Sequence, residues 1–268
     1  MATVAVLQSS ATASAGTVPA AATACPKGGK PTIVLVHGAW ADGSSWDGVI
    51  TRLERLGYPV VAPPDPLRGV SSDAAYLADY LSTVKGPIVL VGHSYGGMVI
   101  TNAAVGNHHV KALVYDDAYI PAQGQTVVGI TSAKPGSALA VPDPTTVFNL
   151  VPYPGAPAGD ADLYLKPEVV RTAFAQDVSF LKQNQLIATQ RPVTASALNE
   201  PSGNPAWKSI PSWALIGRQD RIIPPAEQRA MARTAHAHVT EINSSHVSLV
   251  SHPQAVADVI VKAARTVR

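Results

Sequence analysis

Short runs of apolar residues recur along the chain, and many of them are rich in β-branched side chains. Runs of this kind, bounded by Gly, Pro or polar residues, are typical of strands that a sheet buries on both faces. Read in this way, the pattern predicts strands at residues 31–36, 60–62, 88–91, 112–115, 213–216 and 239–242.

The segments between these strands mostly fit helices. We expect helices at residues 44–56, 71–84, 98–105 and 254–265, several of them with Gly or Pro near an end. Strands that alternate with helices predict an α/β fold with a doubly wound, mostly parallel sheet and right-handed crossover connections.

One long stretch, residues 121–211, interrupts this alternation. Its first part is rich in Pro and Gly, its second part has a helical pattern at residues 167–189, and no convincing strand stands out. A long insertion in a regular α/β pattern is usually functional. We therefore expect a core made of residues 31–120 and 212–268, with residues 121–211 as a mainly helical lid over the carboxyl edge of the sheet.

The composition agrees with a large apolar core. Of the 268 residues 46% are hydrophobic and 14% are charged, and the net charge is +2. This length suits a single α/β domain with an insertion. No run of Lys or Arg indicates a nucleic-acid partner, and no segment is apolar enough to span a membrane. The sequence indicates no particular oligomeric state.

The first 30 residues differ from the rest because Ala, Ser and Thr dominate them. Ala13-Ser14-Ala15 fits the small-x-small pattern of a signal-peptidase site, although the apolar run before it is short and lacks preceding basic residues. We interpret residues 1–30 as the remnant of a secretory signal, which predicts a secreted protein. The alternative is a disordered leader on a cytoplasmic one. Cys25, the one cysteine, falls here and cannot form an internal disulfide.

A Gly-x-Ser-x-Gly motif, residues 92–96, follows the predicted strand at 88–91 directly. The strand before it and the helix after it are the context in which this motif carries a nucleophilic serine. Small neighbours permit a tight turn that raises the Ser94 hydroxyl above the sheet edge, at the N-terminus of the next helix. Ser94 is therefore the candidate nucleophile, and a glycine-rich turn with an ordinary serine is the alternative.

Two later loops offer partners for Ser94, since a serine hydroxyl needs a base. His246 comes just after the strand at 239–242, and Asp220 just after the strand at 213–216. In a parallel sheet both loops lie on the same edge as Ser94. Asp116 and Asp117, after another strand, compete with Asp220 for the role of acid. We favour Asp220 because its loop neighbours the His246 loop in chain order.

The remaining parts of such a site are donors for an oxyanion and a pocket for substrate. The backbone N–H groups of Ala39 and Tyr95 are the expected donors. Aromatic residues near the site or in the insertion are expected to line a pocket: Trp40, Tyr119, Phe148, Tyr153 and Phe174. All three phenylalanines lie in the insertion. They fit an apolar substrate pocket or simple packing of the lid onto the core, and the sequence leaves both open.

Four blocks of the sequence, at residues 34–40, 92–97, 217–224 and 245–246, resemble the conserved blocks of the α/β-hydrolase fold family. The resemblance is strongest to small bacterial esterase-like members with a helical lid, and it spans about residues 31–265. It is specific for the fold and for a Ser–His–Asp triad, and only weakly specific for substrate. No clear strands precede residue 31, so we expect a sheet shortened at one edge.

The residues and the resemblance together predict a serine hydrolase that cleaves carboxylic esters with a small or medium acyl group through an acyl-enzyme, without metal or organic cofactor. Amides, lactones and thioesters remain open as substrates. One alternative is a cofactor-free haloperoxidase or perhydrolase on the same triad. A second is an enzyme like a hydroxynitrile lyase, although such lyases are expected to place Lys beside the histidine, where this chain has Val247. A third is a ligand-binding relative without catalysis.

Overall fold

The fold is built on a parallel sheet of six strands. The computed structural model describes residues 29–267, so the predicted signal remnant lies almost entirely outside the described residues. The strand order is β2-β1-β3-β4-β8-β9, and every neighbouring pair is parallel. The strands are β1 (Thr32–Val36), β2 (Val60–Val61), β3 (Ile88–His93), β4 (Val110–Asp116), β8 (Ser212–Gly217) and β9 (His238–Ile242).

Each strand predicted for the core is present, with ends that differ by at most two residues. The central strand β3 is buried at every position, as expected of a strand with helices on both of its faces. Sequential strands are joined by helices rather than by hairpins, which agrees with the predicted doubly wound α/β fold.

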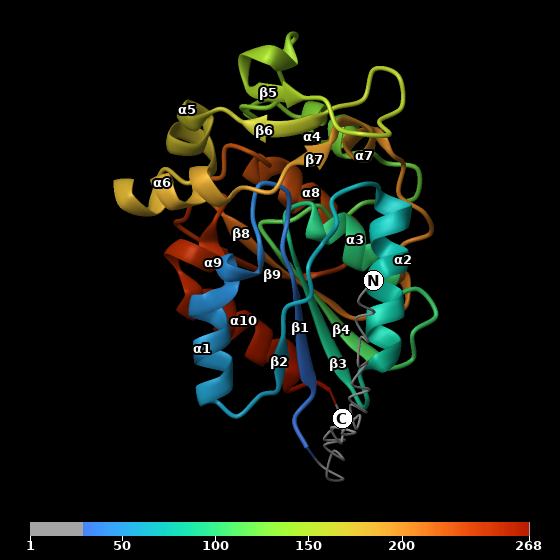
Figure 1. Ribbon diagram of the computed structural model, residues 1–268. Helices are drawn as coiled ribbons and strands as arrows, with labels where there is room; N and C mark the ends of the chain where they lie inside the picture. Colours follow the sequence, from blue (N-terminus) through green and yellow to red (C-terminus); the bar gives the residue numbers. More distant parts are fainter. Residues whose placement is uncertain (1–28, 268) are drawn as a thin grey trace, which may run out of the picture.

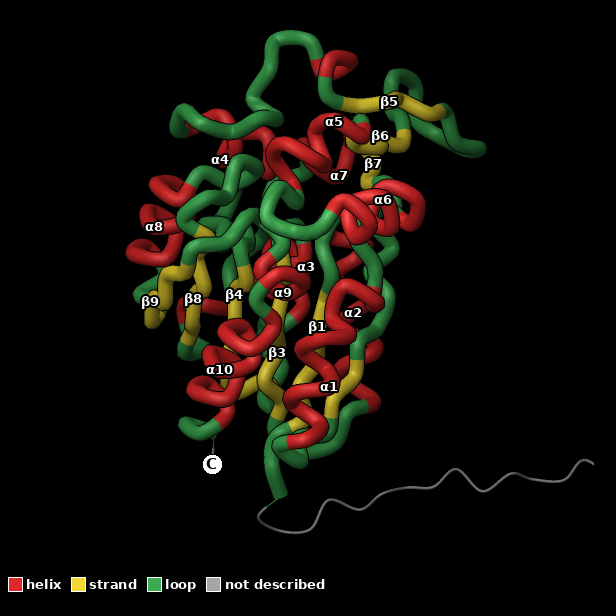
Figure 2. Tube along the Cα trace, turned by 90° about the vertical axis from the view of Figure 1, so that its left-hand side faces the viewer, coloured by secondary structure: helices red, strands yellow, loops and turns green. Residues whose placement is uncertain are grey.

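Helices cover both faces of the sheet (Figures 1 and 2). On one face α1 (Asp47–Arg55) packs against α10 (Pro253–Ala264), and on the other α2 (Val70–Thr83) packs against α3 (Gly96–Ala103). Helix α8 (Pro225–Thr234), which the hydrophobic pattern did not predict, packs on β8 and β9. A short 3-10 helix, η1 (Gly43–Trp46), precedes α1, and α9 (Ser248–Ser251) precedes α10.

Residues 121–211 are called the insert below. Most of the insert lies over the carboxyl ends of the strands, at the top of Figure 1, and its final residues lead to the start of β8 at the other edge of the sheet. The insert contains several short helices. They are α4 (Val127–Ala133), η2 (Pro144–Thr146), α5 (Pro167–Val169), the π-helix η3 (Val170–Phe174), α6 (Phe180–Thr189), α7 (Ala195–Asn199) and η4 (Ala206–Lys208).

The expectation that the insert contains no strand is wrong. β5 (Phe148–Val151), β6 (Asp162–Leu165) and β7 (Val193–Thr194) form a separate antiparallel sheet in the order β5-β6-β7. In β6 the apolar residues Leu163 and Leu165 are buried, but Asp162 is buried as well, so burial does not alternate cleanly. These strands are only two to four residues long and are separated by Pro- and Gly-rich loops or by helices. A two-residue period over so few residues is too short to be recognised.

No helix within residues 29–267 is long and apolar enough to cross a membrane.

Candidate active site

Ser94 occupies the sharp turn between β3 and α3. Its φ of 52° lies in the left-handed region, which is uncommon for a residue with a side chain. The turn lies very close to the end of β1. A Cβ at position 96 would be only 2.7 Å from the carbonyl oxygen of Val36. Glycine at position 96 therefore lets this turn form, as expected of a Gly-x-Ser-x-Gly motif.

The three side chains predicted to act together meet at this turn. His246 Nε2 lies 2.8 Å from Ser94 Oγ, and His246 Nδ1 lies 2.8 Å from Asp220 Oδ2. They come from three separate loops at the carboxyl edge of the sheet, after β3, β8 and β9. Ser94 is 2% exposed, Asp220 3% and His246 0%. A hydroxyl, an imidazole and a carboxylate are thus joined in one buried chain of hydrogen bonds.

Asp220 is held by donors besides the histidine. Its Oδ1 accepts hydrogen bonds from the backbone N–H groups of Ile222 and Ile223, and its Oδ2 accepts one from the side-chain amide of Gln228. Donors of this kind stabilise a buried carboxylate in its charged form and fix its direction. Sequence reasoning missed Gln228, since it lies in the unpredicted helix α8 and belongs to no local motif.

The competing acids serve other contacts. Asp116 accepts a hydrogen bond from the Ser248 hydroxyl, and Asp117 accepts one from the N–H of Gly217. Within residues 29–267 neither carboxyl group is hydrogen-bonded to His246. Burial raises the pKa of Asp116 to about 7, although the Ser248 hydroxyl opposes the rise. Burial and the neighbouring Asp116 also raise the pKa of Asp117 well above its usual range.

His93, which precedes Ser94, supports the candidate base. Its Nε2–H donates to the backbone carbonyl of His246 at 2.8 Å, and the two imidazole rings lie 4.9 Å apart. Burial lowers the pKa of His93 well below the usual value, and the neighbouring His246 lowers it further. His93 is therefore neutral and can donate this hydrogen bond without placing a second positive charge beside His246.

The predicted oxyanion donors lie on two segments that touch each other. A Cβ at Gly38 would lie 2.6 Å from Ser94 Cβ and 3.2 Å from the backbone nitrogen of Tyr95, so the loop after β1 contacts the nucleophile turn. Among the described residues, no backbone carbonyl accepts a hydrogen bond from the N–H of Ala39 or of Tyr95. Two buried N–H groups thus remain available for a ligand, whereas buried N–H groups are normally paired.

Three of the aromatic residues predicted for the pocket form a cluster beside the triad. The Trp40 ring stacks on Phe148 at 5.5 Å and meets the edge of Phe174 at 6.3 Å. Phe174 in turn lies 5.3 Å from the His246 ring. The backbone N–H of Tyr119 donates to the carbonyl of Ser94, so this residue also lies next to the nucleophile.

Tyr153, the fifth predicted pocket residue, does not join this cluster. Its hydroxyl donates to Asp160 and the Arg68 guanidinium lies over its ring.

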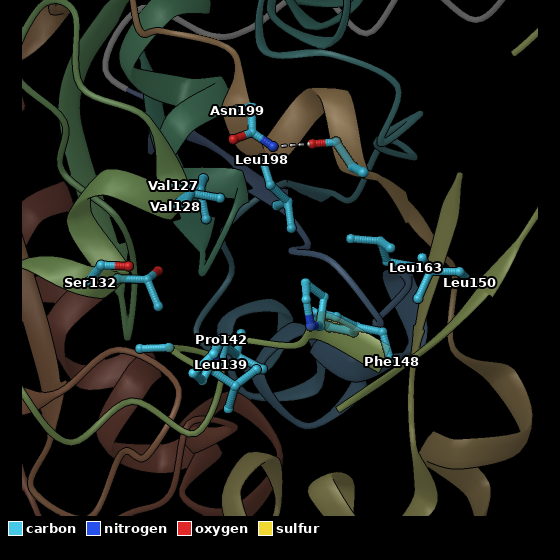
Figure 3. A pocket seen from close by; sticks show the side chains of 15 residues that line it. Val127, Val128, Ser132, Leu139, Pro142, Phe148, Leu150, Leu163, Leu198 and Asn199 are labelled. Atoms are coloured by element: carbon cyan, nitrogen blue, oxygen red, sulfur yellow. Dashed lines mark hydrogen bonds between the residues drawn. The ribbon is translucent and has the colours of Figure 1, made fainter. Parts of the chain in front are cut away.

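A cavity of about 530 Å³ lies within the insert (Figure 3). Most of the side chains around it are apolar, and none is charged. They are Val127, Val128, Thr131, Ser132, Leu139, Ala140, Val141, Pro142, Pro144, Phe148, Leu150, Leu163, Ala195, Leu198 and Asn199. Two of these residues contact side chains that lie near Ser94 or His246. Phe148 stacks on Trp40, and the Thr131 hydroxyl is hydrogen-bonded to the Tyr119 hydroxyl at 2.8 Å.

The insert also contacts the loop that carries His246. The backbone N–H of Ser245 donates to Asp177, a residue of the segment between η3 and α6. Sequence reasoning missed Asp177, because the two residues lie 68 positions apart and no local signal connects them. Within residues 29–267, no group of three or more His, Cys, Asp or Glu side chains is arranged to hold a metal ion.

Comparison with known proteins places the chain in a family. Residues 33–259 match the family model described as "Alpha/beta hydrolase family". A pyrethroid hydrolase of Sphingobium wenxiniae is 30% identical over 85% of this chain and 85% of its own length. A carbendazim hydrolyzing esterase of a Nocardioides species is 34% identical over 36% of this chain and 46% of its own length.

Solved structures agree on the fold. The crystal structure of polyneuridine aldehyde esterase matches 87% of this chain and 98% of its own length, with a TM-score of 0.73 and 19% identity. An identity this low supports the fold alone. The family match covers most of the chain, including the Ser94 turn, the Asp220 loop and the His246 loop. The chain therefore belongs to the alpha/beta hydrolase family and is a hydrolase.

Proposed function

We propose that this protein hydrolyses small, uncharged carboxylic esters through an acyl-enzyme on Ser94. The observation that carries the proposal is the hydrogen-bonded chain from Ser94 through His246 to Asp220. The N–H groups of Ala39 and Tyr95 beside it, which have no backbone acceptor within residues 29–267, support the same chemistry. Nucleophile, base, orienting acid and oxyanion donors are the groups that acyl transfer requires.

The proposed reaction begins when Ser94 Oγ attacks the ester carbonyl carbon and His246 Nε2 takes the hydroxyl proton. The N–H groups of Ala39 and Tyr95 stabilise the negative charge on the tetrahedral carbonyl oxygen. Protonated His246 then gives its proton to the alcohol oxygen, the bond from carbon to that oxygen breaks, and the acyl group stays on Ser94. Asp220 stabilises the imidazolium throughout.

Water completes the proposed cycle. His246 removes a proton from a water molecule as its oxygen attacks the acyl-enzyme, and the same proton returns to Ser94 Oγ as the carboxylic acid leaves. The protein's own side chains and backbone N–H groups supply every catalytic group in this scheme, and no cofactor takes part.

The cavity in the insert supports an uncharged acyl group as the part of the substrate that this enzyme recognises. Apolar side chains such as Val127, Leu139 and Leu198 line it. A charged group would lose its hydration there without gaining an ionic partner. We assign the acyl chain to this cavity because Phe148 and Thr131 connect its wall to residues that contact the Ser94 turn.

The relatives support hydrolysis as the reaction. One curated relative is a pyrethroid hydrolase and another is an esterase that hydrolyses carbendazim. The alternatives on the same triad lack a supporting contact; at the position after the histidine, Val247 offers no ammonium group for a lyase reaction. Secretion and the domain limits at residues 121 and 211 stay predictions from the sequence.

Turnover of 4-nitrophenyl butyrate tests the proposal. We expect hydrolysis by the wild-type protein and its loss, by about 10⁴-fold or more, in Ser94→Ala. Ser212→Ala is the matched control, because Ser212 is equally buried but begins β8, at the opposite end of the sheet, and should keep wild-type turnover. Folded wild-type protein with no turnover across a panel of esters would favour a ligand-binding relative instead.

A further inference from the structure

Trp40 has an unusual backbone for a large residue. Its φ is 59°, in the left-handed region, where an L-residue other than Gly, Asn or Asp is rare. This conformation is strained and persists only where surrounding contacts hold it in place. Trp40 is also 3% exposed, so those contacts can be identified.

Among the described residues, the hydrogen bonds and ring contacts of Trp40 come from the insert. Its backbone N–H donates to the carbonyl of Arg191 at 2.9 Å, and its indole N–H donates to the carbonyl of Leu163 at 2.8 Å. Its ring lies against Phe148 and Phe174. One residue of a core loop therefore joins four separate segments of the insert.

The same loop carries the predicted oxyanion donor. Ala39 directly precedes Trp40, and Gly38 lies against Ser94. The backbone N–H groups of Ala39 and Trp40 differ in their hydrogen bonding. The Trp40 N–H is used by Arg191, whereas the Ala39 N–H is left unpaired among the described residues. The left-handed conformation of Trp40 thus directs the Trp40 N–H to the insert, while the Ala39 N–H faces no acceptor among the described residues.

We propose that Trp40 is a positioning residue for the oxyanion hole, through which the insert fixes the Ala39 N–H beside Ser94. This inference rests on the function proposed above. When the insert moves away, Trp40 loses two hydrogen bonds and its stacking partners, and its strained φ relaxes. The Ala39 N–H lies one residue before the Trp40 N–H along the backbone, so a change of backbone conformation at Trp40 also moves this donor, and stabilisation of the oxyanion falls. The insert is then required for catalysis as well as for binding the acyl group.

The same contacts explain why Ser94 is covered. Phe174 lies against His246 and Trp40 lies against Phe174 and Phe148, while Ser94 and His246 are almost fully buried. Substrate entry therefore needs part of this cluster to move. Return of Trp40 to its hydrogen bonds with Arg191 and Leu163 restores the donor before the attack.

Trp40→Phe tests this inference, since it keeps an aromatic ring and removes the indole N–H. We expect kcat for 4-nitrophenyl butyrate to fall about tenfold to a hundredfold, with KM within about twofold. Trp213→Phe is the matched control, because Trp213 is another buried tryptophan, near the start of β8, and lies against His238.

A pair of ketones separates positioning from mere stability. A trifluoromethyl ketone forms a tetrahedral oxyanion on an active-site serine, whereas the matching methyl ketone binds mainly as the neutral ground state. In Trp40→Phe the affinity for the trifluoromethyl ketone should fall by the same factor as kcat, and that for the methyl ketone should not change. Phe148→Leu, which removes a stacking partner from the insert side, should shift the ratio of the two affinities in the same direction.

The outcomes are distinct. Equal losses for both ketones, or an unchanged kcat in a folded Trp40→Phe protein, would overturn the inference and leave the proposed function intact. If Trp40→Phe fails to fold, an unchanged ratio of the two ketone affinities in Phe148→Leu would overturn the inference as well. No turnover by wild-type protein, together with no adduct of any ketone, would overturn the proposed function first.

Discussion

The carboxyl edge of the sheet and the insert above it are built by different kinds of contact. At the sheet edge, buried polar groups are joined by short hydrogen bonds, such as those linking Ser94, His246 and Asp220. In the insert, aromatic and aliphatic side chains pack around a cavity and against Trp40. Hydrogen bonds are directional, so they fix positions, whereas apolar contacts tolerate changes of shape.

This difference in contacts suggests that the sheet edge and the insert have different roles. In the proposed mechanism, the sheet edge holds the reacting groups in fixed geometry, and the insert determines which acyl groups reach them. Changes at the sheet edge should then affect every substrate, whereas changes around the cavity should affect substrates according to their size. The following substitutions test whether the two regions differ in this way.

The largest effects should come from the polar chain itself. His246→Ala should lower kcat at least as far as Ser94→Ala, because the base and the nucleophile act as one unit. Asp220→Asn should lower kcat about 10⁴-fold by favouring the wrong tautomer of His246. Steady-state kinetics on 4-nitrophenyl acetate measure both effects.

Asp117→Asn is the matched control for Asp220→Asn. Its carboxyl group is just as buried but contacts Gly217 and Ser248 rather than the imidazole. A loss in Asp117→Asn as large as that in Asp220→Asn, with the fold intact by circular dichroism, would argue against Asp220 as the orienting acid.

A substitution in the cavity should discriminate between substrates. Leu139→Trp fills part of the cavity, so kcat/KM for 4-nitrophenyl hexanoate should fall about tenfold while that for the acetate stays within twofold. Leu181→Trp is the control, because Leu181 is 69% exposed on α6 and does not line the cavity. Equal losses for acetate and hexanoate would place the acyl group elsewhere.

The buried carboxyl groups at the sheet edge should make stability depend on pH. The pKa of Asp116 rises from 3.8 to about 7 because of burial. The folded protein therefore keeps a proton that the unfolded chain releases. This stabilisation is complete below about pH 4 and is lost as the pH rises through 7.

Asp116→Asn removes the part of this dependence that comes from position 116. Relative to the wild type, the variant should gain about 2 kcal/mol of unfolding free energy between pH 5 and pH 8, measured by urea denaturation. A difference between the two proteins that stays constant over this range would contradict a raised pKa at position 116.

The smallest effect should come from an ion pair that joins the two regions. Arg68, in the core, lies 2.6 Å from Asp162 of β6, and the Arg68 side chain is 41% exposed. Solvent screens such pairs, so Asp162→Asn should lower stability by less than about 1 kcal/mol and change kcat by less than twofold. A larger loss of activity would mean that this ion pair, rather than Trp40, holds the insert over the site.

The sequence was sufficient for the parts of the molecule that depend on local pattern. The core strands could be predicted because burial on both faces leaves unbroken apolar runs, as at residues 88–91. The Ser94 motif was recognisable since the strand and the helix around it are adjacent in the chain. The loops of Asp220 and His246 followed from parallel topology, which brings the carboxyl ends of the strands to one edge.

Other parts depend on residues that are distant in the chain. Nothing around Gln228 indicates that its amide binds Asp220, and nothing around Asp177 indicates that it binds the His246 loop. The strands β5, β6 and β7 were missed because each is too short to show a period. Trp40 was predicted to lie near the pocket, but its hydrogen bonds to Leu163 and Arg191 depend on how the insert folds back.

Covalent labelling tests the central claim, that Ser94 is an activated nucleophile, most directly. The folded protein is treated with a fluorophosphonate probe, digested, and analysed by mass spectrometry. We predict a single adduct on the peptide that contains Ser94, and no adduct in His246→Ala under the same conditions. Folded wild-type protein that remains unlabelled, or that carries its adduct on a serine other than Ser94, would contradict the account.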